Sequence, residues 1–213
     1  MSYVINLTLT GQPALVVGAG TIAARKIDSL LDAGARVTVV APRVGGDVER
    51  MAAGRRVTLH RRPYASGDVR HMRIVVAATD DEQVNADVSR DATGAGVLVN
   101  VVDRPALCTF TIPAVVRRGA LTLAVATEGQ CPACARALRE ELEARYGPEY
   151  DAVVQLLGRA RARLRAAGWD SARIQATLSD LWQAGIVDCV RRGDDARIRS
   201  LLESRLGELA AAL

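Results

Sequence analysis

The sequence predicts an α/β protein, with a Rossmann-type parallel-sheet domain first, a small α+β region next and a helical domain last. Continuous apolar runs alternate with helical periodicity through the first hundred residues, which is typical of a parallel sheet covered on both faces. A glycine-rich turn joins the first strand to the first helix, and only helical patterns follow residue 149. These three observations together predict the fold class.

The elements of the first domain follow in order from these patterns. Apolar runs bounded by turn residues predict strands over residues 14–17, 37–40, 57–60, 74–78 and 97–102. Helical spacing predicts helices over residues 22–31, near 48–51 and over 81–93. The last of these helices begins with acidic residues, which suit the positive end of the helix dipole.

The pattern changes after the fifth strand. Residues 109–116 and 120–126 are two β-like runs around a tight turn at 117–119. A helix is expected from Cys131 to about Tyr146, where Gly147-Pro148 ends it. We therefore expect three parts, whose bounds are residues 1–106, 107–146 and 147–213.

Composition excludes some classes of function. Only 3% of the 213 residues are aromatic, which argues against stacking on nucleic-acid bases. The net charge of +4 favours anionic ligands without choosing among them. The chain lacks the run of about 18 apolar residues that spans a bilayer, and its start lacks the pattern of a secretory signal. The four cysteines form no disulfide framework, which favours a reducing cytoplasm. Taken together, these observations predict a cytoplasmic protein with neither nucleic-acid nor membrane partners.

The turn after the first strand carries the pattern G-x-G-x-x-A. Gly18 permits a tight turn, and Gly20 lets the backbone approach a pyrophosphate. Ala23 is small enough for the helix to pack closely on its strand. The start of the helix then presents backbone N–H groups to phosphates, which predicts dinucleotide binding.

The end of the second strand leaves the choice of dinucleotide open. It lacks the acidic residue that usually holds the ribose hydroxyls of NAD. Arg43 stands nearby, and an arginine at that place is able to meet the 2′-phosphate of NADP.

Several segments, taken with the glycine turn, resemble the precorrin-2 dehydrogenase family, the N-terminal part of siroheme synthases. They occur in the family's order and cover roughly residues 3 to 145. The matching segments are VGAGTIAARK (17–26), AATDD (77–81), NVVDRP (100–105), FTIPA (110–114), GQCPA (129–133) and RALRE (136–140).

The resemblance implies NAD-dependent oxidation of precorrin-2 to sirohydrochlorin, so NAD is the cofactor that we expect. It also implies a homodimer joined through the central region and, in some members, insertion of iron, with Fe²⁺ or Co²⁺ as substrate rather than as a resident metal. The methyltransferase domain of the larger siroheme synthases is not expected within these residues. Matching positions imply cofactor contacts from Gly18, Gly20, Thr21, Ile22, Pro42, Arg43, Thr79, Asn100 and Val102.

Asp103 is the catalytic candidate. It ends the fifth apolar strand, where a carboxylate faces the ligand crevice of an open α/β sheet. Dehydrogenation needs a group that takes a proton, and the resemblance assigns chemistry to this aspartate. The alternative is a strand-end aspartate that caps the turn before Pro105.

Cys131 and Cys134 form one C-x-x-C pair, for which the sequence offers no second pair or nearby histidine that would complete a metal site. Pro132 fits the first helical position, which makes Cys131 the N-cap. The resemblance places Gly129, Gln130 and Cys131 at the tetrapyrrole pocket, where the family usually carries serine in place of Cys131. We expect Cys134 in the apolar core, and the alternative is a disulfide-exchange role for the pair.

Two further questions stay open in the sequence. Four arginines at positions 159, 161, 163 and 165 spread around one predicted helix. They are either solvated side chains or side chains that attract a polycarboxylate substrate. A protein that binds a dinucleotide or a tetrapyrrole without turnover is the alternative to the enzyme.

Overall fold

The computed structural model describes residues 3–211. It divides into two compact units that meet in the sequence between Ile112 and Pro113. Among the residues described, no helix combines the length and the apolar character needed to cross a bilayer.

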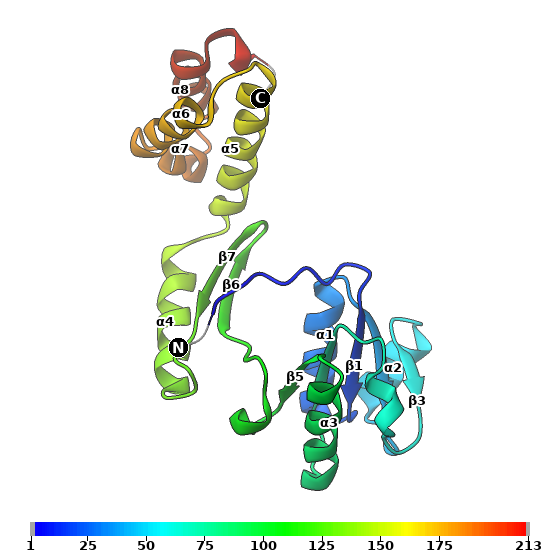
Figure 1. Cartoon of the computed structure of the whole chain (residues 1–213). Helices are drawn as coiled ribbons and strands as arrows, with labels where there is room; N and C mark the ends of the chain where they lie inside the picture. The colour runs from blue at the N-terminus through cyan, green and yellow to red at the C-terminus, as the bar shows by residue number, and fades with distance from the viewer. Residues whose placement is uncertain (1–2, 212–213) are drawn as a thin grey trace. The chain divides into compact units, whose positions relative to one another are not determined.

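The first unit is built on five parallel strands in the order β3-β2-β1-β4-β5 (Figure 1). The central strands are runs of valine, leucine and alanine buried on both faces, as a parallel sheet requires. The strands are β1 (Pro13–Val17), β2 (Arg36–Val40), β3 (Thr58–His60), β4 (Ile74–Ala77) and β5 (Leu98–Val101).

Helices cover both faces of this sheet because alternate strand residues feed two separate apolar clusters. One cluster joins Val16 and Val39 to Ile27 of α1 and to α2. The other joins Leu15 and Val75 to Val88 and its neighbours on α3. The helices are α1 (Thr21–Asp32), α2 (Gly46–Ala53) and α3 (Glu82–Gly94), with short 3₁₀ turns η1 (Ser66–Val69) and η2 (Pro105–Leu107). The predicted Rossmann-type domain is therefore confirmed.

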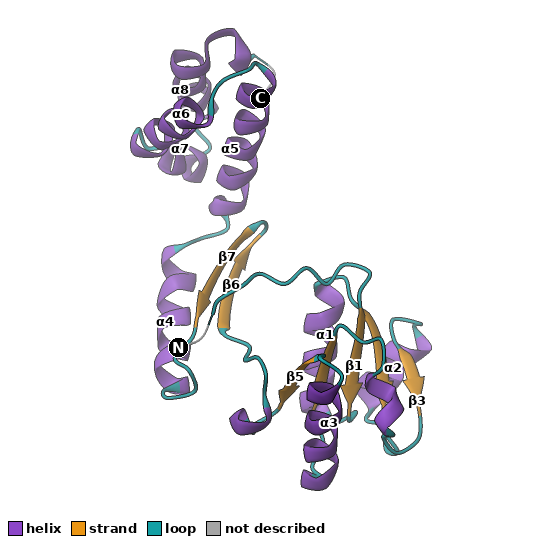
Figure 2. Ribbon diagram, in the orientation of Figure 1, coloured by secondary structure: helices purple, strands orange, loops and turns teal. Residues whose placement is uncertain are grey.

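The second unit begins with an antiparallel hairpin and continues as helices (Figure 2). The helices after α4 enclose a core of their own, with Leu164, Leu181 and Ile186 fully buried. The elements are β6 (Ala114–Arg118), β7 (Leu121–Val125), α4 (Pro132–Arg145), α5 (Glu149–Ala166), α6 (Ser171–Gln183), α7 (Ile186–Arg192), α8 (Asp195–Leu206) and η3 (Gly207–Ala210). The division into three parts stays a prediction, because the hairpin, α4 and the later helices fall within one of the two units.

The first strand of the hairpin was predicted to begin at residue 109, and this bound is wrong. The segment before β6 is held along β5 instead, where the Thr109 N–H donates to the Val99 carbonyl over 2.9 Å and the Val99 N–H donates to Thr109 Oγ1 over 2.8 Å. Pro113 then offers no N–H to a strand ladder. Pairing with β7 therefore starts only at Ala114.

A charged clamp holds the loop between β3 and β4. Arg62 donates two hydrogen bonds to Asp68, at 2.8 and 2.6 Å, and the Ala65 N–H donates a third at 2.9 Å. The bonds from Arg62, more than the N–H of Ala65, hold the pKa of the Asp68 carboxyl below its ordinary value, against the opposing effect of burial.

We expect Asp68→Asn to lower the free energy of unfolding by about 1–2 kcal/mol at pH 7, because charge-assisted hydrogen bonds are lost while Arg62 remains partly exposed. The folded pKa is the lower one, so this stabilisation is present above the ordinary value of 3.8 and is lost as the pH falls through the folded value. Urea titrations from pH 7 to pH 3 should show the two proteins converging at the acid end. Asp47→Asn is the control, since Asp47 and Arg50 form an exposed pair, and a pH-independent difference at position 68 would contradict the explanation.

Candidate functional site

The carboxyl ends of the central strands align in one row. Val17 lies opposite Val40 of β2 and Ala77 of β4, and Ala77 lies opposite Val101 of β5. The ladder continues one residue further, because the N–H groups of Gly18, Ala78 and Val102 donate to the carbonyls of Val40, Val17 and Ala77 at 2.8–3.0 Å. The segments that carry the cofactor candidates Pro42, Arg43 and Thr79 and the catalytic candidate Asp103 all leave the sheet from this edge, next to the glycine turn.

Gly18 is required by the shape of the turn. Its φ of +108° lies in the region that only glycine adopts easily. A Cβ at this position would lie 2.8 Å from the carbonyl carbon of Ala78, closer than real Cβ contacts. The residue therefore brings the first turn against the end of β4 with no room for a side chain.

Gly20 has the opposite surroundings. A Cβ on Gly20 would meet no atom within 4 Å, so the space above this backbone is open. Gly20 is the N-cap of α1, and no side chain caps the helix. In the part of the chain described, the N–H groups of Thr21 and Ile22 also make no hydrogen bond.

These features fit a pyrophosphate. An uncapped helix start with open space in front of it offers N–H donors and a positive dipole to an anion. Thr21 is exposed, and the apolar Ile22 beside it exposes 46% of its surface. Ala23 is fully buried and lets α1 approach the sheet.

Gly45 also belongs to this region, although its place there could not be predicted from the sequence. The Gly45 N–H donates to the Ala19 carbonyl over 2.9 Å and ties the start of α2 to the glycine turn. A Cβ on Gly45 would lie 2.9 Å from the same oxygen. The only signal in the sequence was the Gly45-Gly46 pair before a helix, which does not by itself indicate what the pair approaches.

Arg43 has an acidic neighbour that the sequence did not indicate. The exposed Pro42 and Arg43 follow β2, and an Arg43 Nη lies 3.7 Å from a carboxylate oxygen of Asp80. Both side chains are about nine-tenths exposed, at 89% and 91%. The pair sits where two parallel strands end, so a ligand at this edge would meet a positive and a negative charge together.

Thr79 is held rigidly after β4. The Asn85 Nδ2 donates to the Thr79 carbonyl over 3.0 Å, and Thr79 Oγ1 lies 3.0 Å from Asn85 Oδ1. The Asp81 N–H also donates to Thr79 Oγ1, over 3.1 Å. Asn85 is one of the few buried polar residues between residues 3 and 211, and it positions this turn.

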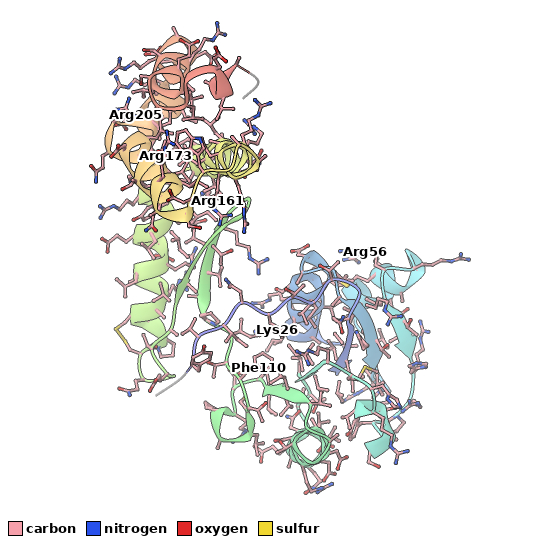
Figure 3. All side chains as sticks on the ribbon, turned by 45° about the horizontal axis from the view of Figure 1, so that its top comes forward. Lys26, Arg56, Phe110, Arg161, Arg173 and Arg205 are labelled. Atoms are coloured by element: carbon pink, nitrogen blue, oxygen red, sulfur yellow. A yellow bond between two sulfur atoms is a disulfide. The ribbon has the colours of Figure 1, made fainter. Side chains whose placement is uncertain are left out.

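Asn100 and Val102 have structural partners. Asn100 Nδ2 donates to the Phe110 carbonyl over 3.1 Å, which fastens the segment after β5 to the sheet. Phe110 is labelled in Figure 3. Val102 is half-buried and packs against the apolar cluster of α1. Their cofactor contacts stay predictions, and any contact from Asn100 would use its remaining amide oxygen.

Asp103 lies in a tight turn directly after β5. The Arg104 N–H donates to the Val101 carbonyl over 3.2 Å, which closes the turn. Asp103 has a φ of +58°, a conformation that costs about 1–3 kcal/mol for most residues and is most easily adopted, after glycine, by asparagine and aspartate. Its side chain is exposed, and no group between residues 3 and 211 bonds the carboxylate. A strained, exposed and unpartnered carboxylate is suited to act on a ligand.

The remaining candidates belong to the second unit. Gly129 has a φ of +79° and, with Gln130, forms an exposed turn before α4. Cys131 is the N-cap of α4 with Pro132 at the first helical position, as predicted. The prediction that Cys134 packs in the core is wrong, because Cys134 is exposed and forms a disulfide with Cys131. The N-cap and the third residue of a helix stand close enough for this bond, with Cα atoms 5.3 Å apart.

Two hollows lie outside the strand-end row. One, of about 330 Å³, runs between α1 and α2 beside Thr21 and Asp28. The other, of about 540 Å³, lies between α5 and α6, and its rim includes Arg161 (Figure 3). Arg165, Trp169 and Trp182 also line this second hollow. Across residues 3–211, no group of three or more histidine, cysteine or acidic side chains is placed to hold a metal ion.

Comparisons with known proteins agree with this geometry. A family model described as putative NAD(P)-binding matches residues 5–114. The siroheme synthase of Ectopseudomonas mendocina is 39% identical over 202 residues, which are 95% of this chain and 43% of that protein. Those of Pseudomonas paraeruginosa and Pseudoalteromonas atlantica are 40% and 34% identical over 93% and 90% of this chain. The chain spans less than half the length of these curated relatives.

A solved structure extends the similarity to both units. The structure of SirC, precorrin-2 dehydrogenase, superposes with a TM-score of 0.76 at 29% sequence identity. The match covers 96% of this chain and 99% of that one, so the helical unit is included.

Proposed function

We propose, from the premise that this chain belongs to the family of putative NAD(P)-binding proteins matched over residues 5–114, that it is an NAD-dependent precorrin-2 dehydrogenase. The observation that carries the proposal is the row of strand ends, where an open glycine turn, an uncapped helix start and an unpartnered carboxylate leave the same edge of the sheet. The similarity to SirC, precorrin-2 dehydrogenase supports the choice of substrate.

The reaction removes two hydrogens from precorrin-2 and yields sirohydrochlorin, NADH and a proton. NAD bound at this edge supplies the hydride acceptor. Gly20 leaves room for the pyrophosphate, and the N–H groups of Thr21 and Ile22 bind it. Asp103 accepts the proton at a carboxylate oxygen that no other group occupies.

We infer that NAD is preferred over NADP. A 2′-phosphate near Arg43 would also approach the carboxylate of Asp80, which already lies 3.7 Å from the guanidinium. Repulsion between the carboxylate and the phosphate opposes the attraction that Arg43 offers alone. The free 2′-hydroxyl of NAD meets no such repulsion.

Gly129, Gln130 and Cys131 are proposed to contact the tetrapyrrole, and a homodimer is proposed to form through the hairpin. Among the residues described, β6 and β7 pair only with each other. A two-stranded sheet is marginally stable alone, and its free edges are ready to pair with another chain. Iron or cobalt insertion, with Fe²⁺ or Co²⁺ as substrate and Asp103 accepting pyrrole protons, is a second activity compatible with the same carboxylate. A cytoplasmic location fits an enzyme that depends on a soluble dinucleotide.

An anaerobic assay tests the proposal directly. Purified protein is mixed with precorrin-2, with and without NAD, and visible absorption is recorded; NAD-dependent appearance of the sirohydrochlorin spectrum is expected. Addition of Fe²⁺ or Co²⁺ to the product then tests chelation. Intact NAD binding without any spectral change would leave a dinucleotide-binding protein and contradict the dehydrogenase. Light scattering on the same sample should give about twice 22.7 kDa for the dimer.

A further inference from the structure

The Cys131–Cys134 disulfide lies at the start of α4 and takes no part in the reaction proposed above. Its two cysteines are three residues apart and both belong to the first turn of the helix (Figure 3). Cys131 is half-buried and Cys134 is exposed, so reagents in solution can reach the bond.

A role as a structural staple is poorly supported. A disulfide stabilises mainly by closing a loop in the unfolded chain, and the effect is smallest for short loops. This bond joins no two elements, because both sulfurs belong to the turn that opens α4. The helices that follow already enclose an apolar core of their own.

The two sulfurs have different surroundings. As the N-cap, Cys131 Sγ accepts the Cys134 N–H over 3.2 Å. Pro132 occupies the first helical position, and the positive end of the helix dipole faces the N-cap sulfur. Both features favour a thiolate on Cys131 over one on Cys134 once the bond is opened.

We propose that Cys131 and Cys134 form a thiol–disulfide exchange site whose partner is a dithiol. A thiolate of the dithiol attacks the exposed Cys134 Sγ, the bond between the cysteines breaks, and Cys131 leaves as a thiolate. The second thiol of the partner then attacks the mixed disulfide and releases Cys134. Two electrons pass from the dithiol to the protein disulfide, the partner becomes a disulfide, and the two thiol protons go to the cysteines or, where Cys131 stays a thiolate, to solvent.

Chemistry and location support exchange. A thiol with a lowered pKa is the better leaving group, so Cys131 is placed to leave and Cys134 to be attacked. In a reducing cytoplasm, the location proposed above, a disulfide is usually transient and catalytic or redox-sensing. The exchange itself does not depend on the dehydrogenase, and the two proposals fail separately.

Opening the disulfide should also change the turn before α4. The effect on substrate binding that we derive from this change rests on the proposed function. The Gln130 N–H donates to the Thr127 carbonyl over 2.9 Å, and the Cys131 N–H donates to Thr127 Oγ1 over 3.4 Å. Opening the disulfide frees the N-cap that ends this turn. We therefore expect the oxidised and reduced proteins to differ in KM for precorrin-2 and to share one KM for NAD.

Alkylation and peptide mass spectrometry of the whole, folded chain test the exchange. Trypsin releases both cysteines in the peptide of residues 119–136, while Cys108 and Cys189 fall in peptides 91–117 and 174–191 as internal controls. After dithiothreitol or a thioredoxin-type protein dithiol, alkylation should add two carbamidomethyl groups to the peptide of residues 119–136. When the reduced protein is instead treated with oxidised glutathione before alkylation, this peptide should again carry no label. Comparing the rate of reduction by the protein dithiol with the rates for dithiothreitol and reduced glutathione distinguishes a protein partner from the small-molecule pool.

Variants give the direction of the reaction. Iodoacetamide should label Cys131 roughly threefold to tenfold faster than Cys134 in the reduced protein at pH 7. Cys131→Ser treated with oxidised glutathione should accumulate a mixed disulfide between Cys134 and glutathione, because no second protein thiol displaces the glutathione. The unaltered reduced chain releases the glutathione through attack by Cys131, and Cys189→Ser is the matched control. A bond that dithiols reduce only after denaturation would overturn the proposal, and so would a pair of thiols that oxidised glutathione leaves unjoined.

Discussion

Asp103→Asn is expected to lower NAD-dependent turnover of precorrin-2 by about 10²- to 10⁴-fold, the range that general acid–base groups contribute. The asparagine amide keeps the size of the side chain but does not accept a proton. Because Asp103 is exposed and unpartnered among the described residues, and because asparagine tolerates a positive φ, the turn after β5 should survive. We expect the thermal midpoint and the Kd for NAD to stay close to those of the unaltered protein.

Two comparisons make this result specific. Asp103→Gly relieves the strain of the φ of +58° and should be equally inactive while being at least as stable. Asp32→Asn changes an exposed aspartate at the far end of α1 and should keep full turnover. If Asp103→Asn retained turnover within about threefold of the original, far less than a base contributes, then Asp103 would not be the proton acceptor.

Changing each of the two glycines of the first turn to alanine is expected to have a different effect: Gly18→Ala should lower the stability, and Gly20→Ala should lower the affinity for NAD. Gly18→Ala places a Cβ 2.8 Å from the Ala78 carbonyl carbon at a φ of +108°, and should cost about 3 kcal/mol or more of stability. Gly20→Ala places its Cβ in open space, at an extended φ of −81° that alanine adopts freely. The folded state should therefore tolerate the second change.

The loss at Gly20 should appear in binding instead. The added methyl group occupies the space that we assign to the pyrophosphate, so we expect the Kd for NAD to rise about 10- to 100-fold, equivalent to roughly 1.4–2.7 kcal/mol. Urea unfolding without NAD and calorimetric titration with NAD measure the two effects separately. Gly20→Ala with unchanged affinity would show that the dinucleotide does not approach α1 at this point.

Much of the first unit could be predicted from the sequence because its signals are local. Buried parallel strands need continuous apolar runs, and residues 14–17, 74–78 and 97–102 show them without any knowledge of their partners. The glycine spacing predicted a strand–turn–helix. The resemblance to siroheme synthases is confirmed by relatives that are 39% and 40% identical over most of the chain.

Contacts between distant segments were decided only by the tertiary structure. The pairing of Arg43 with Asp80, the tie from Gly45 to Ala19 and the bond from Asn100 to Phe110 each join segments that the sheet brings together. No local pattern encodes such partners, because they depend on strand order and register. The predicted start of the hairpin strand was wrong for the same reason, because Thr109, which precedes Ala114, is hydrogen-bonded to β5.

The cysteine pair separates the two kinds of information most clearly. The sequence by itself determined that Cys131 caps a helix, because Pro132 follows it and an N-cap is a local property. It did not determine the side on which Cys134 falls, since burial depends on what packs against that face of α4. The tertiary structure leaves that face exposed, and the two sulfurs then stand near enough to bond.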